Sequence, residues 1–237
     1  MTTIDEVTPR PTTWTTGRII EKELPGSNMV RLRMHVDDRQ RHWPGQHYLI
    51  RLRAPDDYTA QRSYSVASDD DDPLVELLVE KLPGGEVSEF LAGVAEVGDV
   101  LEMRGPIGRW FIWDTRTPAL CLVGGTGVVP AVAMTRTARR LGRSHLLRVV
   151  AVGRNQEALP YADELARAGA SVAFTRQATD GRPAGPPTAA EVTPLLVGRE
   201  LAYVCGSSRF AEYAEDLLLA CGVDAAAIRV EQFGATG

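Results

Sequence analysis

Residues 123–130 have the sequence Val123-Gly124-Gly125-Thr126-Gly127-Val128-Val129-Pro130 and continue the apolar run 119–123. A short apolar strand, a glycine-rich turn and a helix start, in this order, are typical of the turn that holds a dinucleotide diphosphate in an α/β sheet. Pro130 fits the first helical turn, where its missing N–H has no partner to lose. The run lacks the G-x-G-x-x-G spacing of common dehydrogenases. We therefore predict a ligand-binding turn, with purely structural glycines as the alternative.

The residues downstream of this turn alternate between strand and helix patterns. Short apolar segments predict strands, amphipathic segments predict helices, and Gly222 is a good C-terminal cap for the last helix. The predicted strands are 119–123, 146–152, 171–174, 201–205 and 228–232, and the predicted helices are 128–141, 161–168, 187–196 and 208–221. Such alternation predicts a Rossmann-like parallel sheet covered by helices on both faces.

The residues upstream of the turn have the period-two pattern of half-buried strands. Turn residues separate the segments, and one short helix is predicted at 87–92. The predicted strands are 15–24, 30–35, 48–53, 62–67, 75–80 and 100–104. Several short strands with frequent turns predict an antiparallel barrel or sandwich.

The two patterns meet at 114–118, a polar segment that ends in Pro118. We therefore expect a barrel domain at 14–116 and an α/β domain at 117–237. Residues 1–13 are rich in Thr and Pro and are expected to form a flexible arm.

The composition argues against several function classes for a chain of 237 residues and net charge −5. An acidic chain is a poor candidate for binding nucleic acid. The three cysteines and four histidines lack the spacing of a metal or iron–sulfur site, so no protein-bound metal is expected. No apolar run is long enough to span a membrane and no secretion signal is visible, so we expect a cytoplasmic protein without a membrane partner.

Two further motifs fall in the barrel half. Arg62-Ser63-Tyr64-Ser65 lies on a predicted strand, on which Arg62 and Tyr64 share a face that could meet a phosphate and a planar ring. Gly84-Gly85-Glu86-Val87-Ser88 opens the short helix, and exposed amides at a helix start attract phosphate. The alternatives are a solvated strand edge for the first motif and an ordinary two-glycine turn for the second.

Two motifs end strands of the α/β half. Cys205-Gly206-Ser207 ends the fourth strand, and the carboxyl ends of such strands point into the ligand crevice. No adjacent histidine would activate Cys205 as a nucleophile, so a small buried residue is the alternative. Glu231 and Phe233 project the same way from the last strand, for which the alternative is an edge strand with one anchoring aromatic.

The order of these five motifs resembles the ferredoxin–NADP⁺ reductase superfamily over residues 14–234. The resemblance implies an antiparallel Greek-key β-barrel that binds FAD, followed by an α/β lobe that binds NADPH or NADH. It implies catalytic roles for Ser65 near flavin N5, for Cys205 near nicotinamide C4 and for the carboxylate of Glu231. It implies cofactor-binding roles for Arg62, Ser63, Tyr64, Ser65, Val79, Gly84, Gly85, Glu86, Val87, Ser88, Gly125, Thr126, Gly127, Pro130, Arg154, Arg176, Cys205, Gly206 and Phe233.

Two points of this resemblance stay open. Phe233 is followed by four more residues, so its stacking on the flavin is not established by the motif. Arg154 and Arg176 follow the second and third strands of the α/β half, where either could meet a 2′-phosphate. We therefore favour NADPH over NADH.

The resemblance implies an FAD-dependent NAD(P)H oxidoreductase that passes electrons to an external acceptor, such as a ferredoxin or an oxygenase component. An external acceptor is expected because the chain has no room for an iron–sulfur or haem domain. The alternatives are a free-flavin or small-molecule reductase and a nucleotide-binding subunit of an electron-transfer complex. An acidic acceptor could dock on a group of arginines, for which the alternative is a solvated surface: Arg31, Arg33, Arg39, Arg41, Arg51, Arg53 and Arg62.

Overall fold

The computed structural model describes residues 13–26, 28–179 and 181–233. They divide into two compact units, the first ending at Ile112 and the second beginning at Trp113. The expected arm, residues 1–13, lies outside the described residues apart from Thr13.

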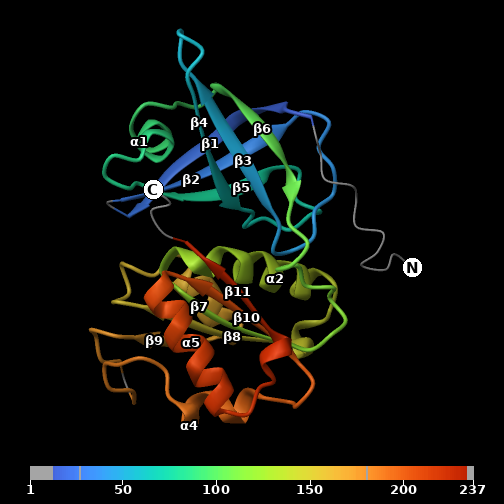
Figure 1. Ribbon diagram of the computed structural model, residues 1–237, viewed down its shortest axis with the longest axis vertical. Helices are drawn as coiled ribbons and strands as arrows, with labels where there is room; N and C mark the ends of the chain where they lie inside the picture. The colour runs from blue at the N-terminus through green and yellow to red at the C-terminus, as the bar shows by residue number, and fades with distance from the viewer. Residues whose placement is uncertain (1–12, 27, 180, 234–237) are drawn as a thin grey trace. The chain divides into compact units, whose positions relative to one another are not determined.

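The first unit is an antiparallel sheet with one helix, α1 (Glu86–Gly93). The strand order is β4-β3-β6-β1-β2-β5 (Figure 1). Val66, directly after β4, forms an antiparallel bridge with Leu77 of β5, so the two outer strands meet and the sheet closes into the predicted barrel. The strands are β1 (Thr15–Gly26), β2 (Met29–Val36), β3 (His47–Arg53), β4 (Thr59–Ser65), β5 (Val75–Glu80) and β6 (Val100–Ile107).

The core of the barrel follows the predicted alternation on β2 and β3, whose inward side chains include Val30, Leu32 and Ile50. β5 differs from the prediction of a half-buried strand, because Glu76 and Leu78 on its other face are also buried. β4 begins three residues earlier than predicted, at Thr59, because its whole length pairs with β3 from Arg53 back to His47.

The second unit is a parallel sheet of order β11-β10-β7-β8-β9, with helices packed against it (Figure 1). Apolar side chains of the strands and helices form one core, which includes Leu122, Val150, Val204 and Leu218. The strands are β7 (Ala119–Gly124), β8 (Leu147–Gly153), β9 (Ser171–Phe174), β10 (Leu201–Gly206) and β11 (Ile228–Gln232), and the α-helices are α2 (Val129–Arg140), α3 (Ala162–Arg167), α4 (Ala189–Val192) and α5 (Ser208–Ala220).

Two predicted helices of this unit differ in detail. The helix predicted at 128–141 is preceded by a 3₁₀ turn, η2 (Gly125–Val128), so the glycine run is itself helical. The helix predicted at 187–196 is only α4 followed by a 3₁₀ turn, η4 (Thr193–Leu195). Pro194 has no N–H to donate to the preceding turn, which ends the α-helix there.

Candidate functional site

The Arg62–Ser65 motif lies on β4, and its register with β3 fixes its side-chain directions. Ile50 pairs with Arg62 and Tyr48 with Tyr64, so Arg62 and Tyr64 share the face that Ile50 and Tyr48 use. Tyr64 is half-buried against the barrel core, and its burial raises the pKa of its phenol to about 12. Ser63 and Ser65 lie on the opposite face, where Ser63 is exposed and Ser65, at the end of β4, is buried.

Arg62 is exposed and is available for an anion. Its guanidinium donates one hydrogen bond, to the carbonyl of Gln61 at 2.8 Å. No carboxylate among the described residues forms an ion pair with it. A guanidinium without a counter-charge, beside a half-buried aromatic ring, fits a phosphate next to a planar group.

The glycine turn before α1 is shaped by Ser88. Its hydroxyl donates to the carbonyl of Gly85 at 3.0 Å and accepts from the N–H of Leu82 at 3.2 Å. A Cβ on Gly85 would lie 2.5 Å from that hydroxyl oxygen, so only glycine fits there. The Ser88 side chain is therefore buried inside the turn. The N–H groups of Gly84 and Gly85 are also used internally, since they donate to the carboxylate of Glu89 at 3.2 Å and to the carbonyl of Leu82 at 2.9 Å. A diphosphate would therefore meet the first N–H groups of α1 rather than the turn or the hydroxyl of Ser88.

The start of α1 has no side-chain cap, so its first N–H groups point out of the helix without a capping acceptor. Val87 is buried, as is Val79 on β5, so both side chains belong to the barrel core and only their main chain is available to a ligand. Glu86 accepts a hydrogen bond from the hydroxyl of Tyr58 at 2.9 Å. This bond ties the start of α1 to the residue before β4, and the sequence analysis missed it.

The two motifs of the first unit therefore converge. α1 and β4 are in contact. The pKa of the Tyr58 phenol is raised mainly by its hydrogen bond to Glu86 and that of Tyr64 by burial, and the charge of Arg62 opposes both shifts, so Arg62 lies near both phenols. Uncapped amides, an unpaired guanidinium and a half-buried ring together fit the diphosphate and ring system of a flavin dinucleotide.

The glycine turn of the second unit is packed against the end of β10. A Cβ on Gly127 would lie 2.4 Å from the carbonyl oxygen of Cys205, which is main chain and cannot rotate away. Gly125 has φ +58° and open space around it, so glycine is favoured there by the left-handed backbone conformation and not by lack of space. Thr126 is half-buried, and Pro130 is buried in the first turn of α2, as predicted.

Cys205 and Glu231 are register neighbours on β10 and β11. Cys205 is fully buried, and its burial, with the charge of Glu231, raises the pKa of its thiol well above the usual value. The thiol is therefore a poor nucleophile, as the sequence analysis expected. Burial raises the pKa of the Glu231 carboxyl to about 7, so that this group holds or releases a proton near neutral pH.

Phe233 lies directly after β11 and is tied to the end of β10. Its N–H donates to the carbonyl of Gly206 at 2.8 Å, and its side chain is half-buried. Cys205, Gly206, Glu231 and Phe233 are thus brought together, next to the Gly127 turn.

Arg154 and Arg176 follow β8 and β9 and lie side by side. The N–H of Arg176 donates to the carbonyl of Arg154 at 2.9 Å. Both side chains are exposed, and neither has an ion pair or a side-chain hydrogen bond among the described residues. Two unpaired guanidiniums at the carboxyl ends of parallel strands fit a phosphate group.

Phe210, in the first turn of α5, is a neighbour of the site that the sequence analysis missed. Its ring packs on the Cα atoms of Gly124 and Gly206. The available signal was an aromatic residue shortly after Gly206, on the face of α5 that also contains Ala211 and Ala214.

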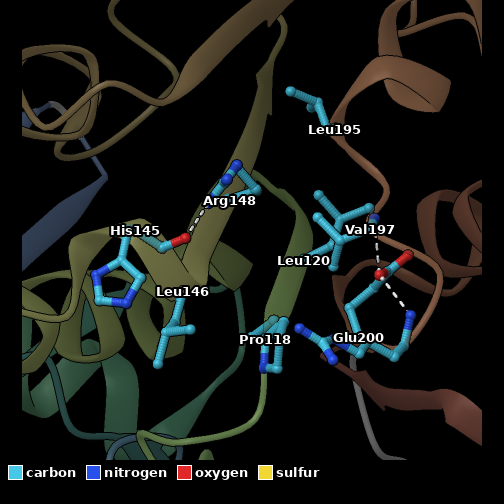
Figure 2. A pocket seen from close by; sticks show the side chains of 10 residues that line it. Pro118, Leu120, His145, Leu146, Arg148, Leu195, Val197 and Glu200 are labelled. Atoms are coloured by element: carbon cyan, nitrogen blue, oxygen red, sulfur yellow. Dashed lines mark hydrogen bonds between the residues drawn. The ribbon is translucent and has the colours of Figure 1, made fainter.

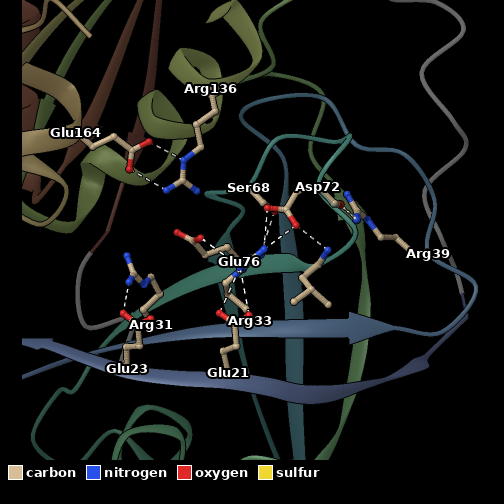
Figure 3. A network of polar contacts seen from close by, with 11 residues as sticks. Glu21, Glu23, Arg31, Arg33, Arg39, Ser68, Asp72, Glu76, Arg136 and Glu164 are labelled. Atoms are coloured by element: carbon tan, nitrogen blue, oxygen red, sulfur yellow. Dashed lines mark hydrogen bonds and ion pairs between the residues drawn. The ribbon is translucent and has the colours of Figure 1, made fainter. Parts of the chain in front are cut away.

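Most of the arginine group on the barrel is ion-paired with acidic side chains, which favours the alternative of a solvated surface over a docking surface for an acidic acceptor. Arg39 donates to main-chain carbonyls of Asp70 and Asp72, and neither Arg39 nor Arg62 forms an ion pair with a carboxylate among the described residues. Figure 3 shows the network around Arg33. The ion pairs of this group include Arg31 with Glu23, Arg33 with Glu21, Asp72 and Glu76, Arg41 with Asp70 and Asp71, Arg51 with Glu102, and Arg53 with Asp57 and Glu102.

One pocket of about 160 Å³ lies at the amino ends of the parallel strands (Figure 2). Pro118 and Leu120 line it from the start of β7, and Arg148 from β8. The carboxylate of Glu200 accepts from the N–H groups of Val197 and Arg199 at 2.9 and 3.1 Å. Because the glycine turn follows the carboxyl end of β7, this pocket is at the opposite end of the sheet from the predicted dinucleotide site.

The described residues contain no group of three His, Cys, Asp or Glu side chains that could hold a metal ion. Within the same residues, none of the helices has the length and apolar character needed to cross a bilayer.

Known proteins resemble both units. Residues 16–112 match the family model of the oxidoreductase FAD-binding domain. The toluate 1,2-dioxygenase electron transfer component of Pseudomonas putida is 30% identical over 201 residues, which are 81% of this chain and 59% of that protein. The ferredoxin–NAD(P)⁺ reductase component of the naphthalene 1,2-dioxygenase system of the same species is 28% identical over 218 residues, which are 88% of this chain and 65% of that protein. The chain thus spans about six tenths of the length of these relatives.

Solved structures resemble the whole described chain in fold. The FAD/NAD binding domain of nitric oxide dioxygenase from Vibrio cholerae has a TM-score of 0.80 at 24% identity, covering 93% of this chain and 98% of that one. A ferredoxin NADP⁺ reductase from Neisseria gonorrhoeae with bound FAD and NADP has a TM-score of 0.77 at 17% identity, covering 92% and 98%. The resemblance inferred from the motifs is therefore supported: residues 16–112 match the oxidoreductase FAD-binding domain family, and the chain is similar in fold to solved proteins that combine an FAD-binding and a nicotinamide-nucleotide-binding domain.

Proposed function

We propose that this chain is an FAD-dependent NAD(P)H oxidoreductase that passes electrons to an external one-electron acceptor. The observation on which this rests is the uncapped start of α1 beside the unpaired Arg62 in one unit, matched by the glycine turn against Cys205 in the other. When bound, the flavin supplies the redox chemistry, taking hydride from the nicotinamide and releasing electrons singly. The protein supplies position and charge.

In the barrel, the chain's own groups hold the flavin nucleotide. The N–H groups at the start of α1 and the guanidinium of Arg62 bind the diphosphate, and the ring of Tyr64 orients the planar part. Ser65, buried on the next position of β4, places its hydroxyl near the reacting edge. These assignments extend the family resemblance to named atoms of this chain.

In the α/β unit, the turn at Gly125–Gly127 holds the dinucleotide diphosphate through its main chain. Glu231 is the group that would hold or move a proton, since its carboxyl has a pKa of about 7. The buried thiol of Cys205 stays protonated and presents a compact, uncharged surface to the nicotinamide.

An absorption spectrum of the pure protein tests this proposal. We expect flavin bands that bleach on anaerobic addition of NADPH or NADH. Arg62→Ala should release FAD more readily, by roughly tenfold in Kd, because one charge-assisted contact to phosphate is lost. Arg62→Lys, the matched control, should recover only part of this loss, since an ammonium lacks the planar fork. A colourless protein that takes up no FAD would reject the proposal.

We further propose that NADPH is preferred over NADH, with Arg154 and Arg176 meeting the 2′-phosphate. Their exposed and unpaired side chains on neighbouring strand ends support this choice. Titration of both nucleotides should give tighter binding of NADPH, and Arg154→Ala should weaken NADPH while leaving NADH unchanged. Equal affinities in the parent protein would remove the preference.

The acceptor we propose is a ferredoxin or an oxygenase component, and the place of action is the cytoplasm. The names of the two Pseudomonas putida relatives support an acceptor within an oxygenase system. The neutralised barrel arginines favour a second candidate, a free-flavin or small-molecule reductase, because they offer little net charge to an acidic protein. Turnover with ferredoxin, compared with turnover with free flavin, distinguishes the two candidates.

A further inference from the structure

Phe210 stands in the space that side chains on two glycines would need. A Cβ built on Gly206 would lie 2.6 Å from ring atom Cδ1, and one built on Gly124 would lie 2.9 Å from Cδ2 and Cγ. Gly124 ends β7 and Gly206 ends β10. One aromatic ring therefore packs on the carboxyl ends of both strands.

Gly206 is also contacted from two other directions. A Cβ on Gly127 would lie 2.7 Å from the Cα of Gly206, and the carbonyl of Gly206 accepts from the N–H of Phe233 at 2.8 Å. The same short piece of main chain thus meets the ring of Phe210, the glycine turn and the segment after β11. A change in the size of the ring would therefore displace both the glycine turn and the segment after β11.

The ring is held in place by the start of α5. The side chain of Ser207 accepts from the N–H of Phe210 at 3.4 Å, and the N–H of Ala211 donates to the carbonyl of Ser207 at 2.8 Å. The half-buried ring packs against the core of the α/β unit. The start of α5 therefore positions the main chain of Phe210, and the packing against Gly124, Gly206 and the core restricts the ring.

We propose that Phe210 is a positioning residue for the nicotinamide nucleotide, a step that rests on the proposed function. Its ring sets the separation between the diphosphate-binding turn after β7 and the Cys205–Gly206 end of β10. Dinucleotides lie across the carboxyl ends of such strands. A smaller side chain at position 210 would let the ends of β7 and β10 shift relative to each other. A displacement on the order of 1 Å is enough to slow a reaction by roughly a hundredfold.

The test is a set of size-compensating variants. Gly124→Ala places a methyl group into the ring and should raise KM for NAD(P)H roughly tenfold, with ferricyanide as acceptor and FAD saturating. Adding Phe210→Leu should restore most of that loss. In the matched control, adding Phe210→Leu to Gly127→Ala should restore nothing, because the obstacle there is the carbonyl of Cys205. Phe210→Leu alone should raise KM and the Kd of the oxidised nucleotide.

A purely structural role has a different signature. It would lower the melting temperature of Phe210→Leu while leaving KM and Kd unchanged well below that temperature, and this result would overturn the inference. Equal rescue, or equal failure, of the two double variants would overturn it as well. A parent protein that binds neither nucleotide would instead reject the proposed function itself, which separates the two failures.

Discussion

The two glycine turns of the molecule use the same residue for different physical reasons. In the turn before α1, Gly84 has φ +73° and nothing within 4 Å of the place where a Cβ would be. In the turn before α2, Gly127 has main-chain atoms of β10 within 2.4–2.7 Å of that place. The first glycine supplies a backbone conformation and the second supplies space. Replacing these glycines by alanine should therefore cost more stability at Gly127 than at Gly84.

The largest effect is expected for Gly127→Ala. Its methyl group must push β10 away from the turn, so we expect the free energy of unfolding to fall by about 3 kcal/mol and NAD(P)H binding to be lost. Urea denaturation and nucleotide titration measure the two effects. Gly142→Ala is the matched control, since Gly142 has φ +65° and open surroundings and tests conformational strain alone. Similar losses in both variants would contradict the packing argument.

The units also differ in their buried titratable groups, beginning with His42 in the barrel. Burial lowers the pKa of His42 to about 4, from an ordinary value of 6.5. Between these values the unfolded chain binds the proton and the folded chain does not, so stability falls as the pH falls from about 6.5 to 4. The loss over this range is about 3 kcal/mol.

Substitution of His42 isolates this contribution. We expect His42→Gln to flatten the dependence of the unfolding free energy on pH between 4 and 6.5, because no proton is taken up at that site. An unchanged slope in His42→Gln would show that other groups govern acid stability.

Glu231 in the α/β unit should act in the opposite direction. Its carboxyl pKa is raised to about 7 from an ordinary value of 4.5, so the folded chain holds a proton that the unfolded chain has lost. The contribution of Glu231 to the free energy of unfolding is therefore greatest below pH 4.5 and falls as the pH rises toward 7. Since the side chain is only half-buried, we expect an effect of about 2 kcal/mol.

Glu231→Gln should remove the loss of stability between pH 4.5 and 7 and raise the free energy of unfolding at pH 8. Urea denaturation at pH 5 and at pH 8 measures the two stabilities. If the variant were less stable than the parent at pH 8, the carboxylate would have a partner that stabilises its charged form.

The sequence was sufficient for features that depend on local pattern and was insufficient for those that depend on tertiary contacts. Period-two alternation predicted β2 and β3, and the alternation of strand and helix patterns predicted the parallel sheet. The bond from Tyr58 to Glu86 and the packing of Phe210 join residues distant in the chain, and no local pattern announces them. The sequence left docking surface and solvated surface open for the barrel arginines for the same reason, because their acidic partners come from other strands and loops.

The smallest effect is expected for Gly84→Ala, which completes the contrast with Gly127. A methyl group meets no atom there, so the only penalty is the left-handed backbone conformation, about 1 kcal/mol. Thermal denaturation should show this modest loss, and FAD affinity should change little because the uncapped amides of α1 remain in place. A large loss of FAD with normal stability would instead mean that the diphosphate passes over Gly84 itself, closer than a methyl group allows.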